Sequence, residues 1–257
     1  MIAAMRRNRI MEEIMANGSA KANELARQFN VSEETIRRDL TQLEESGYVK
    51  KNYGGAIAAS ELQKLMQDIS PVQQRRLCHF KEKQLIGKEA AGLLRPGMSV
   101  FLDSGSTVWS MLPYMNDIKN LTVISNSIDI LKDCAGQESW IVIGLGGQII
   151  AKSMSMVPPG AETQFMSFHV DMAFIGTPGI SAKGDCTSAN LFEANLKKQV
   201  MDSARKPVLL ADASKLGVDA LFTFARLAQF DTVITNPSIG DDMRALISEA
   251  GVHLITA

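Results

Sequence analysis

The sequence predicts an α/β protein in two unequal parts, a small helical N-terminal part and a larger, mostly parallel α/β part. From about residue 81 onward, short apolar runs alternate with helical patterns, which is the order of a parallel sheet covered on both faces. Before residue 56 the chain shows three amphipathic helical stretches and one alternating stretch that ends in two glycines. A length of 257 residues suits one large domain or two unequal ones.

The composition excludes several classes of protein. The chain carries 27 Lys and Arg against 28 Asp and Glu, and 46% of its residues are hydrophobic, so a disordered chain is excluded. Cys78, Cys134 and Cys186 are too widely spaced for a zinc site or a disulfide framework and fit a reducing compartment. No apolar run has the length of a membrane helix, and the start lacks the apolar core of a signal peptide. We therefore expect a cytoplasmic protein with no membrane partner, no metal site and no cofactor.

The N-terminal part reads as three helices and a hairpin. Apolar spacing predicts a first helix over about Ala4–Ala16, which an Asn-Gly pair ends, and a second over Lys21–Phe29. Ser32 is the expected N-cap of a third helix, whose first turn is acidic and which stops at Ser46-Gly47. The stretch Tyr48–Tyr53 then alternates as a short β-hairpin arm would.

Two short helices, a tight turn and a third helix with a basic outer face are the plan of a helix-turn-helix, whose third helix enters the major groove. Arg37 and Arg38 can bind guanine or phosphates, and Thr35 can contact a thymine methyl group or a phosphate. An arginine pair is often no more than a solvated helix face, and only the whole order of caps, apolar spacing, basic face and basic hairpin favours DNA. The predicted DNA-binding residues are Ser32, Glu34, Thr35, Arg37, Arg38, Lys50, Lys51 and Tyr53.

Residues 58–80 are polar and rich in Gln, and they predict a linker, with one helical stretch possible at Ser60–Gln67. Residues 81–257 predict the larger domain. Its expected strands are Ser99–Asp103, Leu121–Ser125, Trp140–Leu145, Met172–Ile175, Pro207–Asp212, Thr232–Thr235 and His253–Thr256. Its expected helices are Lys81–Leu94, Thr107–Met115, Ile128–Ala135, Leu191–Ala204 and Asp241–Ala250.

Small, polar or charged residues follow five successive predicted strands. The segment Asp103-Ser104-Gly105-Ser106-Thr107 comes where a strand should end and a helix begin, so its backbone N–H groups and hydroxyls can hold an anion. The other four clusters are Ser125-Asn126-Ser127, Gly144-Leu145-Gly146-Gly147, Gly176-Thr177-Pro178-Gly179 and Asp212-Ala213-Ser214-Lys215. Each alone is ordinary loop chemistry, but open parallel sheets bind ligands at the carboxyl ends of their strands. Together the five clusters favour a phosphate-bearing ligand.

The N-terminal part contains the run from Val31 to Leu40 (VSEETIRRDL), then Leu43-Glu44 and the ending Tyr53-Gly54-Gly55-Ala56. These motifs together resemble the DNA-binding signature of the DeoR family of bacterial repressors. The resemblance implies a winged helix-turn-helix over residues 1–57, acting as a homo-oligomer, a dimer or tetramer, on operator half-sites. Asp39 also fits the family pattern, and its implied role is to orient a neighbouring arginine without contacting DNA.

The larger part is similar to the sensor domain of the same family, which is related in fold to ribose-5-phosphate isomerase and glucosamine-6-phosphate deaminase. The similar positions include Arg75, Lys83, Ile86, the five-residue turn from Asp103, Asp171, Glu193 and Asp212-x-Ser214-Lys215. The resemblance implies a phosphorylated sugar or polyol as effector, with its phosphate on Gly105, Ser106 and Thr107. The implied effector-binding residues are Asp103, Gly105, Ser106, Thr107, Asn126, Gly146, Gly147, Gly176 and Lys215. The Gly-Ser-Thr-Val form of the turn looks closest to the glucitol (sorbitol) operon repressors.

The polar residues of this part also allow an enzymatic interpretation. Asp103, Asp171, Glu193, Asp212 and Lys215 can be read as an acid–base set for enediol chemistry, or some of them simply as caps and solvated loop residues. We expect ligand binding without turnover and no catalytic residues, because a sensor gains nothing from destroying its signal. The expected function is a repressor released from its operator by a phosphorylated sugar or polyol. The alternatives are a sugar-phosphate isomerase or deaminase with an accessory domain, and an activator that needs no ligand.

Overall fold

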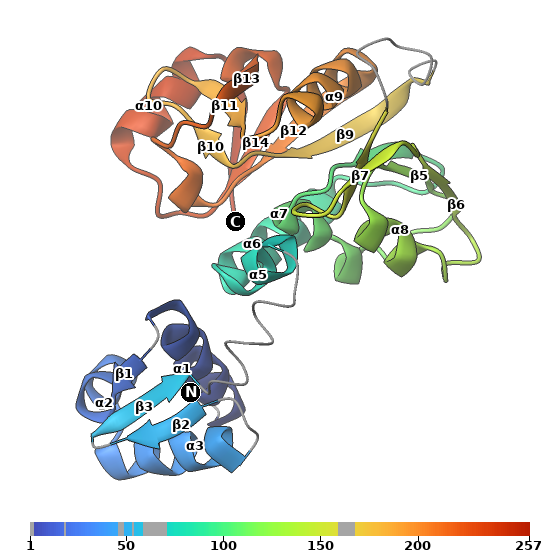
Figure 1. Cartoon of the computed structure of the whole chain (residues 1–257). Helices are drawn as coiled ribbons and strands as arrows, with labels where there is room; N and C mark the ends of the chain where they lie inside the picture. Colours follow the sequence, from blue (N-terminus) through green and yellow to red (C-terminus); the bar gives the residue numbers. More distant parts are fainter. Residues whose placement is uncertain (1–2, 18, 46–48, 53, 59–70, 159–167) are drawn as a thin grey trace. The chain divides into compact units, whose positions relative to one another are not determined.

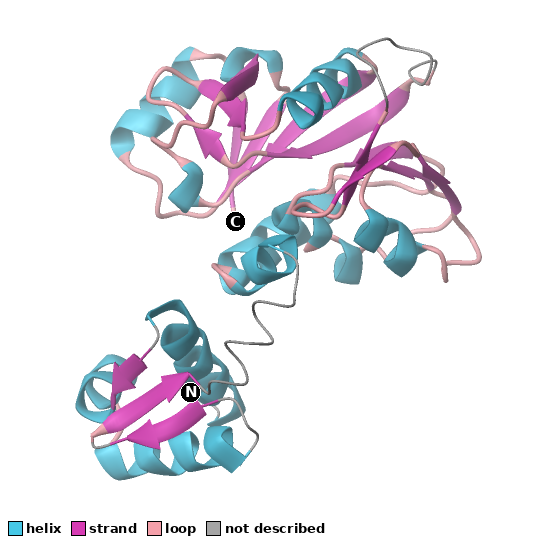
Figure 2. Cartoon of the chain, viewed as in Figure 1, coloured by secondary structure: helices cyan, strands magenta, loops and turns pink. Residues whose placement is uncertain are grey.

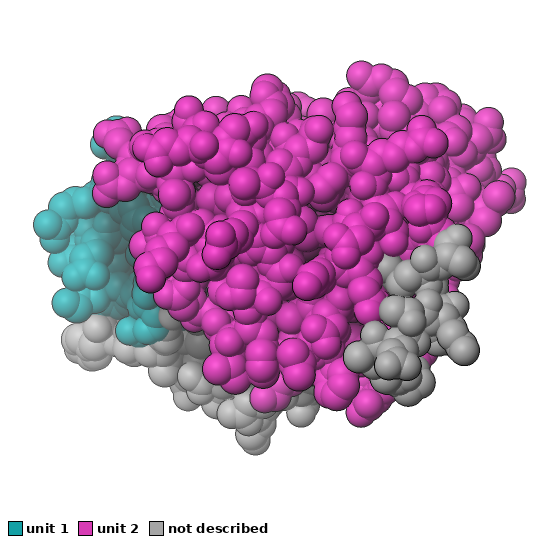
Figure 3. All heavy atoms as spheres, turned by 90° about the horizontal axis from the view of Figure 1, so that it is seen from above, with its two compact units in different colours: residues 1–78 teal, residues 79–257 magenta. Residues whose placement is uncertain are grey.

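The computed structural model describes residues 3–17, 19–45, 49–52, 54–58, 71–158 and 168–257. The chain divides into two compact units, residues 1–78 and 79–257, which Figure 3 colours separately. The predicted α/β class, with a small helical N-terminal part and a larger part built on a parallel sheet, is confirmed.

Residues 3–58 of the first unit form three helices with a small antiparallel sheet (Figure 1). The described elements there are α1 (Ala3–Asn17), β1 (Ser19–Lys21), α2 (Ala22–Phe29), α3 (Glu33–Glu45), β2 (Val49–Asn52) and β3 (Gly55–Ala58). The strand order is β1-β3-β2, and β1, which the sequence pattern did not predict, pairs Lys21 with Gly55. The helices bury one apolar cluster that includes Ile14, Leu25 and Leu40. The β2–β3 hairpin therefore lies beside the third helix, as a wing does.

The turn between α2 and α3 depends on Asn30. This residue adopts the left-handed conformation (φ 50°), which asparagine tolerates better than most residues. The next residue, Val31, donates its backbone N–H to the carbonyl of Ala26 at 3.1 Å, and this hydrogen bond ends α2. The chain can then start α3 only three residues later.

The segment predicted as a linker contains a helix. Pro71–Leu77 forms α5, with proline at the first helical position, where its missing N–H costs nothing. The helical stretch expected at Ser60–Gln67 lies outside the described residues.

The second unit is built on a seven-stranded, wholly parallel sheet in the order β15-β14-β12-β9-β4-β5-β6 (Figure 2). These strands are β4 (Ser99–Leu102), β5 (Thr122–Ser125), β6 (Ile141–Gly144), β9 (Val170–Gly176), β12 (Ala204–Leu210), β14 (Thr232–Thr235) and β15 (His253–Thr256). All seven were predicted, within a few residues at their ends.

Two apolar clusters cover the two faces of this sheet. On one face pack α9 (Leu191–Asp202) and α10 (Asp241–Glu249), and on the other pack α6 (Phe80–Gly92), α7 (Ser106–Trp109) and α8 (Ile128–Cys134). Side chains alternate between the clusters along each strand, as in Phe101 and Leu102 of β4. The sheet is therefore buried on both faces, as the alternating pattern predicts.

The helix expected over Thr107–Met115 was wrong in extent. The structure has the four-residue α7 and then a 3₁₀ turn over Leu112–Tyr114. Pro113 explains the break, because it has no N–H to donate to the carbonyl four residues earlier.

Short strands outside the main sheet were not predicted. They are β7 (Gln148–Ile150), β8 (Ser155–Val157), β10 (Gly179–Ile180), β11 (Asp185–Ser188) and β13 (Phe222–Arg226). The first two form an antiparallel hairpin, and the other three form a small antiparallel sheet. Among the described helices none is long and apolar enough to cross a membrane.

Candidate functional site

The start of α3 is fixed by its own side chains. Ser32 Oγ accepts a hydrogen bond from the backbone N–H of Thr35 at 3.2 Å, and the two hydroxyl oxygens lie 2.9 Å apart. This is the N-cap that the sequence predicts. The hydroxyls of Ser32 and Thr35 are thus held at the N-terminal end of the third helix, where base edges are reached in a helix-turn-helix.

The two arginines of α3 are exposed and only loosely held. Arg37 lies 3.6 Å from Glu33, and Arg38 lies 3.6 Å from Glu34, each one helical turn away. The arginine side chains are 66% and 80% exposed. Exposed ion pairs of this kind contribute little stability, so either arginine can exchange its carboxylate for a phosphate or a base.

The predicted wing lysines are placed differently from one another. Lys51 donates from Nζ to Thr41 Oγ1 at 2.9 Å, and its backbone N–H donates to Glu44 Oε1 at 2.8 Å. Lys51 therefore ties the wing to the third helix in addition to any contact it makes with DNA. Lys50 lies in β2, and Tyr53 falls outside the described residues.

Asp39 faces the interior of the first unit. It is 3% exposed and pairs with Arg6 and Arg7 of α1, with Oδ2 accepting from Arg6 Nε at 2.5 Å. The arginines beside Asp39 in space thus come from α1, and the neighbours in sequence, Arg37 and Arg38, pair elsewhere. This pair fixes the third helix against the first.

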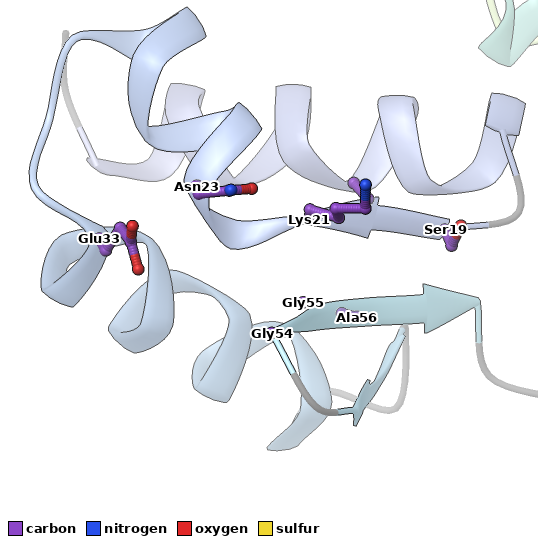
Figure 4. Close-up of a pocket in the computed structure, with 8 residues that line it drawn as sticks. Ser19, Lys21, Asn23, Glu33, Gly54, Gly55 and Ala56 are labelled. Atoms are coloured by element: carbon purple, nitrogen blue, oxygen red, sulfur yellow. The ribbon is translucent and has the colours of Figure 1, made fainter.

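A groove of about 410 Å³ opens beside this helix (Figure 4). It is lined by β1, by the starts of α2 and α3, by the turn after β2 and by the start of β3, through Ser19, Ala20, Lys21, Asn23, Glu33, Gly54, Gly55 and Ala56. Gly54 has a positive φ of 90°, and its carbonyl accepts from Ala22 N at 2.8 Å, which ties the wing turn to the start of α2. Lys21 and Glu33 give the lining one charge of each sign.

In the second unit, the five predicted clusters follow β4, β5, β6, β9 and β12. These five strands are neighbours in the parallel sheet, so all five clusters lie along one edge, at the carboxyl ends of the strands. The edge is polar although much of it is buried. Its buried polar residues include Asp103, Ser106, Thr107, Asn126 and Asp212.

The predicted phosphate turn lies at the start of a very short helix. Gly105 is the N-cap of the four-residue α7, so a helix dipole contributes little there. Within the described residues, no backbone or side-chain acceptor takes the N–H groups of Ser106 and Thr107. Any anion binding at this turn therefore rests on these N–H groups and on the two side-chain hydroxyls.

Lys197 of α9 is the main feature that the sequence pattern missed. It is 7% exposed, forms a buried ion pair with Asp103, and donates to the carbonyl of Gly176 at 3.0 Å. Asp103 Oδ2 also accepts from the backbone N–H of Gly176 at 3.0 Å. Lys197 thereby joins the ends of β4 and β9 to α9. The signal was its spacing, because Ala194, Lys197 and Met201 share the buried face of this helix.

The hairpin β7–β8 crosses the end of β5. The backbone N–H of Met156 donates to the carbonyl of Asn126 at 2.7 Å, and Ser155 Oγ donates to Glu193 of α9 at 2.9 Å. Gly146 and Gly147 form the turn into this hairpin with positive φ angles of 70° and 109°. A Cβ on Gly147 would lie 2.2 Å from the carbonyl oxygen of Val157. Packing of the hairpin therefore requires a glycine at this position, whether or not it contacts a ligand.

Asp212 and Lys215 lie at the end of β12 in a short 3₁₀ turn. Asp212 Oδ1 accepts from the backbone N–H of Ser214 at 3.1 Å, so this carboxylate caps the turn. Lys215 is half-buried, and its ammonium has no hydrogen-bond or ion-pair partner within the described chain.

Three buried polar atoms at this edge have no hydrogen-bond partner among the described residues. They are Asn126 Oδ1 after β5, Asp212 Oδ2 after β12 and Thr235 Oγ1 at the end of β14. A buried acceptor without a partner is costly, so such atoms mark places where a ligand or a water molecule belongs. Thr235 had not been predicted as part of the site.

Asp171 does not belong with the other acidic residues. It lies near the start of β9, where it accepts from the backbone N–H and hydroxyl of Ser99. Five residues of strand separate it from Gly176, which is roughly 16 Å at the usual rise per residue. The acid–base set that includes Asp171 is therefore wrong as a single site. In the described residues, no group of three His, Cys, Asp or Glu is arranged to hold a metal ion.

The chain matches two models of known protein families. Residues 6–61 match the DeoR-like helix-turn-helix domain, and residues 78–237 match the DeoR C terminal sensor domain. It is 29% identical to the HTH-type transcriptional regulator IolR of Bacillus subtilis (strain 168), over 97% of this chain and 98% of that protein. It is 31% identical to the uncharacterized HTH-type transcriptional regulator YgbI of Escherichia coli (strain K12), over 100% and 99%. It is also 31% identical to the HTH-type transcriptional repressor GlcR of Bacillus subtilis (strain 168), over 96% and 93%.

Similarity to solved structures is partial. A ribose 5-phosphate isomerase A from Methanocaldococcus jannaschii matches with a TM-score of 0.37 and 19% identity, over 52% of this chain and 53% of that chain. An eIF2B beta from Chaetomium thermophilum matches with a TM-score of 0.37 and 16% identity, over 55% and 40%. Likenesses of this extent bear on neither the activity nor the ligand.

Proposed function

This chain belongs to the DeoR family of transcriptional regulators, and from that premise we propose that it is a cytoplasmic repressor of a carbohydrate or polyol catabolic operon. Its effector is a phosphorylated sugar or polyol that releases it from the operator. The observation that carries the proposal is the presence, in one chain, of a helix-turn-helix with exposed arginines and a parallel sheet whose carboxyl edge holds unpartnered buried acceptors.

The first unit supplies the DNA contacts. The N-terminal turn of α3, with Ser32, Glu34 and Thr35, faces base edges, while Arg37 and Arg38 exchange their exposed glutamate partners for guanine or phosphate oxygens. Lys50, Lys51 and Tyr53 of the wing bind the adjacent backbone or minor groove. Since residues 1–55 hold nine Lys and Arg against eight Asp and Glu, non-specific attraction is weak per subunit.

The second unit supplies the effector site. The phosphate lies on Gly105, Ser106 and Thr107, where the N–H groups and hydroxyls are donors. Asp103, Asn126, Gly146, Gly147, Gly176 and Lys215 frame the rest of the ligand. A sugar or polyol fits the unpartnered acceptors Asn126 Oδ1 and Asp212 Oδ2, because its hydroxyl groups donate hydrogen bonds.

Release from the operator is a population shift. The effector binds one arrangement of the chain better than the arrangement that fits the operator, and its differential affinity sets how far the equilibrium moves. By linkage, operator DNA must weaken effector binding by the same factor.

The proposal is tested by gel retardation of the DNA upstream of the chain's own gene, followed by a screen of phosphorylated sugars and polyols for release. We expect retardation that weakens steeply with salt and is reversed by at least one phosphorylated compound. If the DNA shows no salt-sensitive retardation, the proposed repressor function is refuted. Retardation that no phosphorylated compound reverses, together with no thermal shift, would favour an activator that needs no ligand.

We further propose that the chain works as a homo-oligomer, a dimer or a tetramer. The support is apolar exposure at one edge of the sheet, where Ile141 and Ile143 of the edge strand β6 are 62% and 43% exposed. Light scattering on the purified chain should give a mass of two or four subunits, and Ile141→Lys should lower it. A monomer at micromolar concentration would refute this part.

The isomerase or deaminase alternative is not favoured. The relatives reported above are all named transcriptional regulators. Asp171 lies at the amino ends of the strands, whereas Asp103 lies at their carboxyl ends, so the five-residue acid–base set is not assembled.

A further inference from the structure

Lys197 lies at the proposed effector site without belonging to the predicted set of ligands. It is buried, it extends from α9 to the end of β4, and its ammonium is shared between the Asp103 carboxylate and the Gly176 carbonyl. Its Nζ also lies 5.7 Å from the centre of the Phe224 ring, so apolar atoms close the remaining side. Burying a charged ammonium group costs free energy, so packing alone does not explain why a lysine occupies this position.

The Asp103 carboxylate lies directly beside the proposed phosphate turn. A Cβ placed on Gly105 would be 4.0 Å from Asp103 Oδ2, and Gly105 and Gly176 approach closely enough for such a Cβ to lie 3.5 Å from the Gly176 Cα. An anion on Gly105, Ser106 and Thr107 would therefore sit next to a buried negative charge. In a buried setting, like charges at this range repel strongly.

The other charges at this edge do not remove the difficulty. Among the described residues, the carboxylates of Asp103, Glu193 and Asp212 lie there, as do the ammonium groups of Lys197 and Lys215. Glu193 accepts a hydrogen bond from the Ser155 hydroxyl, and Asp212 caps its own turn. These contacts bring no positive charge to either carboxylate. Among the charged groups of the described residues, only Lys197 contacts the Asp103 carboxylate, which adjoins the phosphate turn.

We propose that Lys197 is a charge-compensating residue that makes the 105–107 turn able to accept a phosphate. This rests on the proposed function, because it assumes that the turn binds the phosphate of the effector. Lys197 neutralises Asp103, and it holds Asp103 and Gly176 in place while remaining out of direct contact with the ligand. The site thereby keeps a carboxylate without repelling the phosphate. Oδ1 of this carboxylate can accept a hydrogen bond from a hydroxyl group of the effector.

The test is a charge-removal series on the full-length chain, with inorganic phosphate as the probe and isothermal titration calorimetry as the measurement. Lys197→Met should weaken phosphate binding roughly tenfold or more, because it leaves Asp103 as an uncompensated negative charge. The double variant Asp103→Asn with Lys197→Met removes both charges and should restore the affinity to within about threefold of the unsubstituted chain. Lys198→Met, at the exposed neighbouring position on α9, is the matched control and should leave the affinity unchanged.

A residue that only packs α9 against the sheet would behave differently. In that case the double variant would bind phosphate as weakly as Lys197→Met or more weakly, and the inference would be overturned. Unaltered affinity in Lys197→Met would overturn it too. If Lys197→Met does not fold, Asp103→Asn decides, since it should bind phosphate at least as tightly as the unsubstituted chain, and weaker binding refutes the inference. If the unsubstituted chain itself binds no phosphate, the proposed effector class fails and this inference fails with it.

Discussion

Arg6 of α1 and Asp39 of α3 form a buried ion pair, with the guanidinium Nε 2.5 Å from the carboxylate Oδ2 and side-chain exposures of 10% and 4%. Arg7 lies 3.7 Å from the other carboxylate oxygen, so Asp39 is held by two cations from one helix. The helix that carries the proposed DNA contacts is therefore fixed in orientation by a residue that does not face DNA.

Asp39→Ala should destabilise the first unit by about 3 kcal/mol, because it leaves the Arg6 guanidinium buried without its partner. Thermal unfolding followed by circular dichroism measures this. The control is Glu34→Gln, which removes an exposed pair with Arg38 and should change stability by less than about 0.5 kcal/mol. Equal effects of the two substitutions would contradict the structural role assigned to Asp39.

Arg38→Ala should weaken operator binding roughly tenfold or more, since a bidentate arginine contact typically contributes 1–3 kcal/mol. The Arg38 side chain is 80% exposed and contributes little to folding, so stability and effector binding should remain. Arg226→Ala, an arginine of the second unit whose side chain is 79% exposed, is the control and should leave operator affinity unchanged. Loss of both operator and effector binding in Arg38→Ala would indicate misfolding instead.

The elements of the sensor sheet could be read from the sequence because each strand is a short apolar run between turn residues. Thr232–Thr235 and His253–Thr256 were predicted to the residue. The order of the strands could not be read, because it depends on which helices pack together over long separations. The polar strand Asp185–Ser188 was missed because its side chains satisfy one another only in the fold, as when Thr187 Oγ1 donates to the Gly179 carbonyl.

The candidate site was partly readable for the same reason. Strand ends such as Asp103 and Asn126 follow from the strand pattern, since parallel strands share one carboxyl edge. Lys197 was not readable, because its partner Asp103 is 94 residues away and only the packed structure brings α9 over β4. The partner of Asp39 was likewise hidden in α1, 33 residues before it.

Gly147→Ala should be more destabilising than Gly146→Ala, although both glycines precede the β7–β8 hairpin. At Gly147 the added Cβ would lie 2.2 Å from a backbone oxygen and φ is 109°, whereas nothing lies within 4 Å of a Cβ on Gly146. We expect a loss of about 1 kcal/mol for Gly146→Ala, from the left-handed backbone alone, and more than about 2 kcal/mol for Gly147→Ala. Urea unfolding of the two variants measures the difference, and equal losses would show that the hairpin moves aside.

The three cysteines should react with a thiol reagent in two groups. Cys78 is exposed, whereas Cys134 and Cys186 are buried in the two apolar clusters of the sensor unit. Burial, with a smaller effect of the neighbouring aspartate, raises the pKa of each buried thiol to about 12, so the reactive thiolate is scarce at neutral pH. Labelling at pH 7.5 should modify one thiol per native chain and three in denaturant. Rapid modification of a second thiol in the native chain would show that the second unit opens locally.

Asp171 should make the second unit less stable in acid. The backbone N–H of Ser99, and then its hydroxyl, lower the pKa of Asp171 below its ordinary value, with a smaller effect from Arg205. Because the folded chain binds this proton less readily than the unfolded chain, the stabilisation is complete above the ordinary aspartate pKa of about 4. It is lost as the pH falls further, through the lowered pKa of Asp171 in the folded chain.

Asp171→Asn should therefore reduce stability at pH 7 and flatten the dependence of stability on pH between about 5 and 3. The measurement is urea unfolding at a series of pH values, with the exposed Asp219→Asn as the control. An unaltered slope in Asp171→Asn would mean that its contacts with Ser99 are equally good when the carboxyl group is protonated.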